Sequence, residues 1–324
     1  MKKTVCASLL VATLSYAHHG VASLGVVGLE GPGAPVETTS SAMLPEDKFL
    51  AYMKLDYASY KKYTDVIDDE MEESYYWMYG IGYGFKSYLS GYIFLPYYTK
   101  KQEDSVQTSG FHDINLMGVL GFKYDEGFIL TPQNESLDDL EDWHFTIFAN
   151  VSLPTGDSEL KTANGSLYDA GMQLSFGEPS YMIGLSATKW FGNGFTLVMD
   201  TSYNTFQEHT YSDGTRVKFA DEIRANAALA YKFYVNPKKK LRFDTNLEAN
   251  FLHLGRDKEN GVEQEATGGD ILYTTIGFRL FYNNISAALG VKLPVWTKLN
   301  EEDKQQGSEG KEDYRVIFSF STLF

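Results

Sequence analysis

The feature that most constrains this chain is a repeated alternation of apolar and polar residues after residue 47. Segments of roughly 10 to 14 residues alternate with period two, as expected for tilted strands that cross a membrane. We assign twelve of them, at 48–61, 74–85, 88–98, 113–124, 142–152, 179–191, 195–206, 221–234, 240–253, 270–281, 285–297 and 313–324. This pattern predicts an all-β chain.

The connections between these segments alternate in length. Six of them are long, whereas four of the other five are tight turns with the sequences KS, GNG, NPKK and NN. The exception is a long connection at 125–142, on the side of the short turns. Long links on one side and short links on the other are typical of outer-membrane barrels whose termini lie in the periplasm.

One face of the twelve segments carries almost no charge and is rich in Leu, Ile, Val, Phe, Tyr and Trp. Exposed to water, such a face would far exceed the apolar patches that soluble monomers tolerate. No stretch beyond the N-terminal 17 residues approaches the 18 or so consecutive apolar residues of a membrane helix, so a membrane location requires a closed barrel. We predict a closed antiparallel transmembrane β-barrel of about twelve strands in a bacterial outer membrane; the alternative is a soluble β-sandwich.

The opposite face is polar, and we expect it to line the lumen of the barrel. A basic ladder along it would draw an anionic or carboxylated solute, or would pair with Asp200, Asp244 and Glu248 in a structural network. Inward aromatic residues, Trp296 among them, would contact an apolar solute or simply fill space. The candidate lumen residues are Lys54, Asp56, Tyr92, Phe94, Lys123, His144, Asp200, Arg224, Lys232, Arg242, Asp244, Glu248, Arg279, Lys292 and Arg315.

The two ends of the chain carry address signals. Residues 1–17 combine two lysines, an apolar run and small residues before the predicted cleavage after Ala17, the pattern of a secretory signal peptide. The last residues, YRVIFSFSTLF, alternate and end on Phe324. We expect them to form the closing strand, paired with 48–61. Their terminal aromatic residue resembles the signal that the outer-membrane assembly machinery reads.

Residues 18–47 form an irregular arm rich in Gly and Pro, ahead of the predicted barrel at 48–324. Because the arm enters from the periplasmic side, it either folds into the lumen as a plug or remains a periplasmic tail. After cleavage it begins with His18 and His19, and the new α-amine beside two imidazoles offers a ligand set for Cu(II) or Ni(II).

Composition and motifs exclude several other classes. The formal net charge of -15 opposes binding to nucleic acid through its phosphates. No GxSxG elbow, HExxH pair or phosphate loop occurs, and the histidines of the predicted barrel are scattered singly. We therefore expect no enzyme and no cofactor. The acidic loops are expected to be solvated, or to hold divalent cations that bridge to lipopolysaccharide.

Three stretches resemble an outer-membrane barrel family named for the MetA pathway of phenol degradation. They are GFHDINLMGVLGFKY at 110–124, NVSLPTGD at 150–157 and YMIGLSATKWFGNGFTLVMDTSYNTF at 181–206. That family is broadly compared with the uptake barrels for fatty acids and aromatic hydrocarbons. The resemblance implies a channel for passive uptake of small hydrophobic or aromatic molecules, although the acidic insertion at 125–142 departs from it. An anion-favouring diffusion pore and an envelope copper-binding protein are the alternatives.

The copper alternative makes a direct prediction. If the processed protein holds Cu(II) through its N-terminal imidazoles, replacing His18 and His19 together by Ala removes the tight phase of a Cu(II) titration. A tight phase that survives the double substitution contradicts this alternative.

Overall fold

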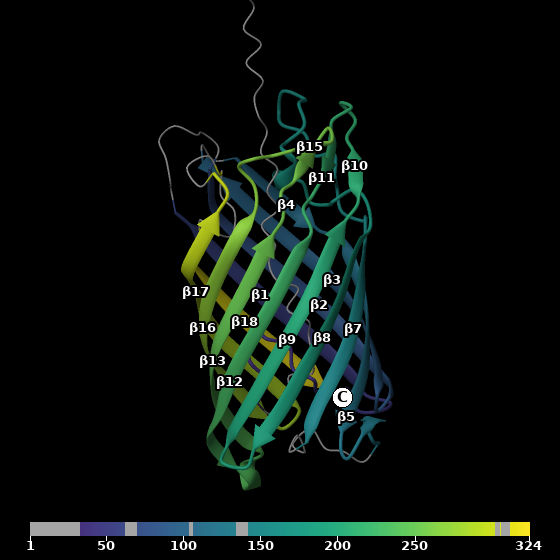
Figure 1. Ribbon diagram of the computed structural model, residues 1–324, viewed down its shortest axis with the longest axis vertical. Coiled ribbons are helices and arrows are strands. Elements are labelled where there is room, and N and C mark those ends of the chain that lie inside the picture. Colours follow the sequence, from purple (N-terminus) through teal and green to yellow (C-terminus); the bar gives the residue numbers. More distant parts are fainter. Residues whose placement is uncertain (1–32, 62–69, 104–105, 134–141, 302–304, 306–311) are drawn as a thin grey trace, which may run out of the picture.

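Hydrogen bonds between the first and last strands close the sheet into a barrel (Figure 1). The computed structural model describes residues 33–61, 70–103, 106–133, 142–301, 305 and 312–324. Each barrel strand pairs antiparallel with its neighbour in the chain, which confirms the predicted barrel of twelve strands. The strands are β1 (Phe49–Tyr60), β2 (Met71–Lys86), β3 (Leu89–Gln102), β4 (Gln107–Phe111) with β5 (Ile114–Tyr124), β7 (Trp143–Leu153), β8 (Ser180–Phe191), β9 (Phe195–Phe206), β12 (Glu222–Asn236), β13 (Leu241–Leu254), β16 (Gly269–Tyr282), β17 (Ile285–Leu299) and β18 (Glu312–Leu323).

The closing pair behaves as the C-terminal alternation predicts. β1 and β18 pair from Leu50 opposite Leu323 to Ser59 opposite Tyr314. Phe49 and Phe324 exchange both backbone hydrogen bonds, at 2.8 and 2.9 Å, and their rings stack with centroids 5.9 Å apart. Closure leaves no strand edge in the hydrocarbon, where an unpaired N–H or C=O group has no water to bind.

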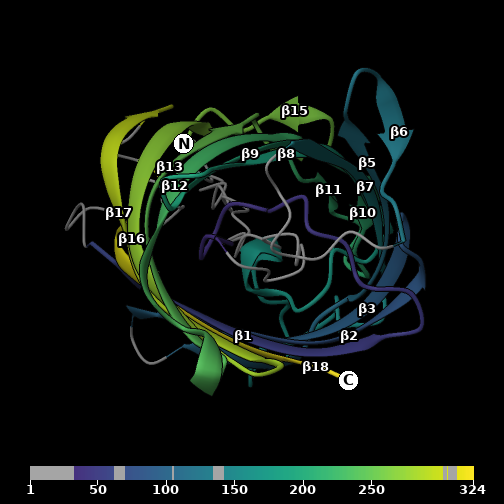
Figure 2. The same ribbon diagram turned by 90° about the horizontal axis from the view of Figure 1, so that it is seen from below.

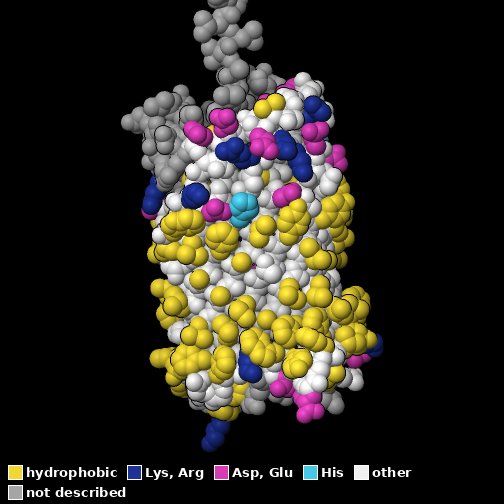
Figure 3. All heavy atoms as spheres, in the orientation of Figure 1, with side chains coloured by type: hydrophobic (Ala, Val, Ile, Leu, Met, Phe, Trp, Pro, Cys, Tyr) yellow, Lys and Arg dark blue, Asp and Glu magenta, His cyan; other side chains and the backbone are white. Residues whose placement is uncertain are grey.

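Apolar side chains cover the outside of the barrel in a broad belt, with charged residues gathered above it (Figure 3). Ile81, Leu247 and Phe278 are 46%, 58% and 60% exposed, values that suit a lipid-facing surface. Within the described part of the chain, no helix is long and apolar enough to cross a membrane.

One inward residue was assigned to the wrong face. Trp296 pairs with Leu272, whereas Pro294 pairs with Tyr273, so β17 carries an extra residue between them. This bulge reverses the alternation, and Trp296 is 48% exposed on the outside instead of lining the lumen. The prediction for Trp296 was therefore wrong.

The two ends of the barrel differ. The end that holds the C-terminus has the short turns, and we assign it to the periplasm. There the 125–142 insertion begins with a short hairpin between β5 and β6 (Phe128–Leu130). At the opposite, external end, two loops build a small sheet that the sequence did not predict, from β10 (Glu208–Thr210), β11 (Arg216–Lys218), β14 (Lys258–Glu259) and β15 (Val262–Glu263).

The lipid-facing assignment can be tested on β13. Leu247→Arg places a charge at mid-strand on the outer face, and we expect it to lower the free energy of unfolding by about 2–4 kcal/mol. Ala163→Arg, in an exposed external loop, is the control and is expected to change it by less than about 0.5 kcal/mol. Urea unfolding in lipid vesicles measures both. Equal effects would contradict the orientation of β13.

Candidate functional site in the barrel lumen

All fifteen candidate lumen residues lie on the inner face of the barrel, and most are buried. Lys123, Arg224, Lys232 and Arg242 keep partial exposure. Part of this burial comes from two stretches of chain that lie inside the ring of strands (Figure 2). One is residues 33–44, here called the lumenal segment, and the other is the external loop 154–179.

The lumenal segment is buried over its whole length. It joins β1 at the periplasmic end, where Asp47 N–H donates to the carbonyl of Gly84 at 2.9 Å. The rest of the predicted arm, including the candidate metal ligands His18 and His19, lies outside the described residues. Within them, no group of three or more His, Cys, Asp or Glu side chains is placed to hold a metal ion.

Glu248 on β13 holds the middle of the lumenal segment by its backbone. Its carboxylate accepts hydrogen bonds from the N–H groups of Val36 at 2.7 Å, Glu37 at 3.2 Å and Thr38 at 2.8 Å. The hydroxyl of Thr38 also donates to it, at 2.7 Å. A buried carboxylate that accepts several N–H donors is well compensated for its loss of water.

Asp200 and Arg279 bind the segment on either side of this contact. The carboxylate of Asp200 on β9 accepts from the N–H of Thr39 at 2.7 Å. The guanidinium of Arg279 on β16 donates to the carbonyls of Ala34 at 3.0 Å and Pro35 at 2.6 Å. These contacts are with the main chain of the segment, on either side of its bend at residues 36–38.

Asp244 serves both the segment and the wall. Its carboxylate accepts from Gly33 N–H at 2.8 Å and from the guanidinium of Arg242 at 2.6 Å. Of the three acidic residues expected to pair with basic residues of the wall, Asp244 does so. The carboxylates of Glu248 and Asp200 instead accept hydrogen bonds from donors on the lumenal segment, and Asp200 also accepts one from the side chain of Asn226.

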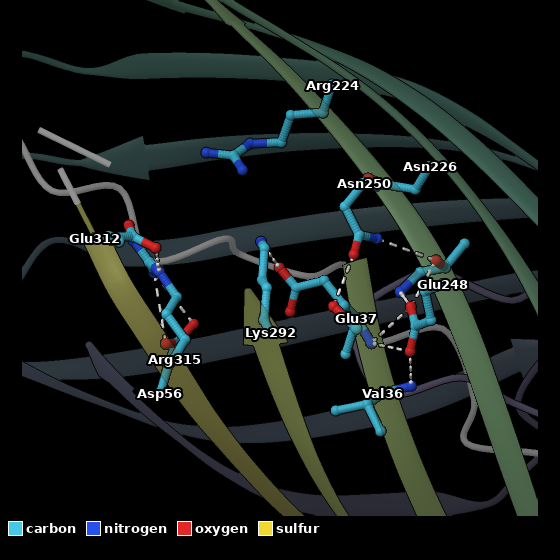
Figure 4. Close-up of polar contacts among 12 residues, drawn as sticks. Val36, Glu37, Asp56, Arg224, Asn226, Glu248, Asn250, Lys292, Glu312 and Arg315 are labelled. Atoms are coloured by element: carbon cyan, nitrogen blue, oxygen red, sulfur yellow. Dashed lines mark hydrogen bonds and ion pairs between the residues drawn. The ribbon is translucent and has the colours of Figure 1, made fainter. Parts of the chain in front are cut away.

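The side chain of Glu37 joins the segment to the opposite wall (Figure 4). Its carboxylate lies 3.2 Å from the ammonium of Lys54 on β1 and 3.1 Å from that of Lys292 on β17. Burial by itself raises the pKa of Glu37, but the charges of Lys292 and Lys54 outweigh it and hold the pKa below its usual range. Glu37 is therefore a carboxylate at neutral pH.

The remaining charges nearby are also paired. Arg315 on β18 donates to the carboxylate of Glu312 and lies 3.4 Å from that of Asp56, and Arg224 lies 3.2 Å from the carboxylate of Glu222. Figure 4 shows Arg315 between its two acidic partners. Arg315 stands directly opposite Lys292 in the β17–β18 pair, so the charged wall extends beyond the two lysines that hold Glu37.

Inward glycines make room for the segment. A Cβ atom at Gly277 would come within 2.4 Å of the Val36 side chain, and one at Gly84 within 2.2 Å of the Pro45 carbonyl. Any larger residue at these two positions would displace the chain inside the barrel. Glycine on the inner face of a strand is therefore a sequence signal for a chain inside the barrel.

Asp113 fastens the external loop 154–179. It lies between β4 and β5, where the strand breaks, and its carboxylate accepts from Thr155 N–H at 3.1 Å, Gly156 N–H at 3.0 Å and Phe176 N–H at 3.1 Å. The stretches GFHD and PTGD, both noted in the sequence, thus meet at one carboxylate.

Lys100 on β3 holds the deepest part of the same loop. Its ammonium donates to the carbonyls of Gly171 at 2.6 Å and Gln173 at 2.7 Å, and the hydroxyl of Thr108 donates to the carbonyl of Met172 at 2.8 Å. Met172 lies in a short helical turn, η2 (Ala170–Met172), and is buried. The loop is therefore fastened inside the external end of the barrel.

A continuous apolar cluster runs along the wall formed by β1, β2, β3, β5, β7 and β8. It begins at Leu174 of the external loop and ends at Met43 and Leu44 of the lumenal segment, so it spans the lumen. The predicted lumen residues Tyr92 and Phe94 belong to it, whereas the charged candidates lie mostly on the other wall. Its members are Ala42, Met43, Leu44, Leu50, Tyr52, Tyr76, Met78, Tyr92, Phe94, Tyr98, Met117, Val119, Phe148, Leu174 and Met182.

A solved structure shares this architecture, and two others are similar at lower scores. The crystal structure of an outer membrane channel from Pseudomonas putida F1 matches 88% of this chain and 98% of its own, with a TM-score of 0.65 and 14% identity. The β domain of the Bordetella autotransporter BrkA matches over 86% and 100%, with a TM-score of 0.48 and 6% identity. The NanC porin matches over 85% and 98%, with a TM-score of 0.44 and 8% identity. No curated protein matches the chain.

The family comparison covers most of the barrel. A family model described as "Putative MetA-pathway of phenol degradation" matches residues 71–308, which include both stretches that meet at Asp113. Together with the closed barrel and its lipid-facing belt, this match places the protein in the bacterial outer membrane. The chain belongs to the family of outer-membrane barrels with that description.

Proposed function

We propose that this protein is an outer-membrane channel for small, largely apolar or aromatic molecules, which pass without bond making or breaking. In the conformation described, the lumenal segment closes the channel from the periplasm and the external loop 154–179 closes it from outside. Passage requires both to move aside. We propose further that the closing strand ending in Phe324 addresses the chain to the outer-membrane assembly machinery and that the charged rim meets lipopolysaccharide.

The apolar cluster is the observation that carries the proposal. A water-filled diffusion pore needs a polar lining, whereas here one wall presents aromatic and aliphatic side chains from one end of the lumen to the other. Aromatic side chains such as Tyr76, Phe94 and Phe148 can exchange their contacts with the internal chain for contacts with a ring of the solute. The family description, which refers to phenol degradation, agrees with this class of solute.

An anion-favouring pore has weaker support. Within its ladder of basic residues, Arg242 and Arg224 pair with Asp244 and Glu222 of the wall itself, so these charges stay paired when the lumenal segment leaves. Lys54 and Lys292 pair with Glu37 only while the segment is in place. Paired charges of opposite sign largely cancel the field that an anion entering from outside would experience. For the copper-binding alternative, the described residues offer no supporting observation.

The closure by the lumenal segment can be tested with one carboxylate. Glu248→Ala removes the acceptor of three backbone N–H groups, and we expect it to raise single-channel conductance in planar bilayers at least threefold above wild type. Asp270→Ala removes a carboxylate on the adjacent strand β16 that pairs with His253, and serves as the matched control. If Glu248→Ala does not conduct more than wild type even when it is combined with Asp113→Asn, which loosens the external closure, the segment is not the barrier.

The class of solute can be tested in the same opened variant. Liposome swelling compares phenyl glucoside with the smaller methyl glucoside, and we expect the aromatic sugar to enter at least twofold faster. Phe148→Ala should reduce that preference, because the Phe148 ring is part of the apolar wall. A general diffusion pore would admit the smaller sugar faster, and that result would contradict the proposed solute class.

The external closure depends on Asp113. Asp113→Asn loses part of three charge-assisted hydrogen bonds, each worth about 1.5–3 kcal/mol, so the external loop should undock more often. We expect at least tenfold faster cleavage of loop 154–179 by a protease added to intact cells. Asp157→Asn, an exposed carboxylate in the same loop, is the control. Equal cleavage of the two variants would show that Asp113 does not hold the loop.

A further inference from the structure

We propose that the place occupied by Glu37 is a binding site for small carboxylic acids that also carry N–H or O–H donors, such as short acidic peptides. The site, here called the bipolar site, consists of Lys54 and Lys292 on one wall and Glu248 and Asp200 on the other. The lumenal segment fills it as an internal competitor. This inference rests on the proposed function, because the site becomes accessible only when the segment leaves.

The basic wall of the bipolar site is built to hold a carboxylate. The ammonium groups of Lys54 and Lys292 reach the two oxygens of Glu37 at 3.2 and 3.1 Å, and the side chains of both lysines are at least 96% buried. The Lys292 ammonium also lies 4.4 Å from the centroid of the Tyr273 ring. Two cations taken out of water in this way need a resident anion, since removing one partner leaves buried charge uncompensated.

The acidic wall selects for donors. Glu248 and Asp200 accept from N–H and O–H groups at 2.7 to 3.2 Å, and the amide of Asn250 donates to the hydroxyl of Thr38 at 3.4 Å. Figure 4 shows Glu37 directed towards Lys292 while the adjacent main chain meets Glu248. A simple anion satisfies the lysines but meets two carboxylates opposite, and a neutral hydrocarbon satisfies neither wall.

The lumenal segment shows what such a ligand looks like. Glu37 is the one charged residue between residues 33 and 44, and it is flanked by small or hydroxyl-bearing residues. Its carboxylate faces the lysines while its own N–H and those of Val36 and Thr38 face Glu248. A solute with a carboxylate next to amide or hydroxyl donors reproduces both sets of contacts, whereas a phosphate or a phenol does not.

A peptide copy of the segment tests the bipolar site. The full chain carrying Glu37→Ala is titrated calorimetrically in detergent with acetyl-Val-Glu-Thr-Thr-amide and with acetyl-Val-Gln-Thr-Thr-amide. We expect the variant to bind the glutamate peptide at least tenfold more tightly than wild type does, because the resident carboxylate no longer occupies Lys54 and Lys292 and the segment is held less firmly. The glutamine peptide should bind the variant at least tenfold more weakly than the glutamate peptide.

Two further measurements separate failure of the bipolar site from failure of the proposed channel. Adding Lys292→Met to Glu37→Ala should abolish the preference for the glutamate peptide, and heat-modifiable gel migration checks that each variant is a folded barrel. Equal binding of the two peptides by a folded Glu37→Ala protein overturns the bipolar site, even if that protein conducts. Peptide preference without any conductance in Glu37→Ala or Glu248→Ala supports the bipolar site and contradicts the channel.

Discussion

Closure of the hydrogen-bonded ring is the constraint on which the rest of this structure depends. In hydrocarbon, each open strand edge would leave a row of unpaired N–H and C=O groups, so β1 must meet β18. The two hydrogen bonds and stacked rings of Phe49 and Phe324 complete the ring at its periplasmic end. Closure also fixes which side chains face inward, and thereby gathers charged residues from distant parts of the chain into one lumen.

The barrel could be predicted because lipid acts on every strand in the same way. Along each strand, successive residues face the lipid and the lumen in turn, so the alternation of apolar and polar residues identifies both the strands and their two faces. The prediction failed where local geometry breaks the period. Trp296 follows a bulge in β17, and the small external sheet consists of strands of two or three residues, too short for any periodic signal.

The residues of the barrel wall that form the candidate site could be predicted, but their partners inside the lumen could not. The inward positions of Glu248, Asp200 and the lysines follow from the alternation, but their partners lie in a segment without periodicity. Charge pairing within the wall was the natural expectation, since sequence gives no distance to residues 33–44. The better signal was steric: Gly84 and Gly277 leave inward space that the backbone of another segment fills.

The chemistry of the two closures explains how a filled barrel can still serve as a channel. An apolar core that fills a lumen is costly to separate, because its packing is lost to water. Buried ion pairs come close to breaking even with their hydrated states. The ion pairs of Glu37 and the charged hydrogen bonds of Asp113 and Lys100 to backbone groups are strong while dry, yet water entering the lumen replaces most of their energy. Because polar contacts hold both internal stretches in place, their closure of the lumen can be reversible. Only the ends of the apolar cluster, at Leu44 and Leu174, must give up their packing when solute enters.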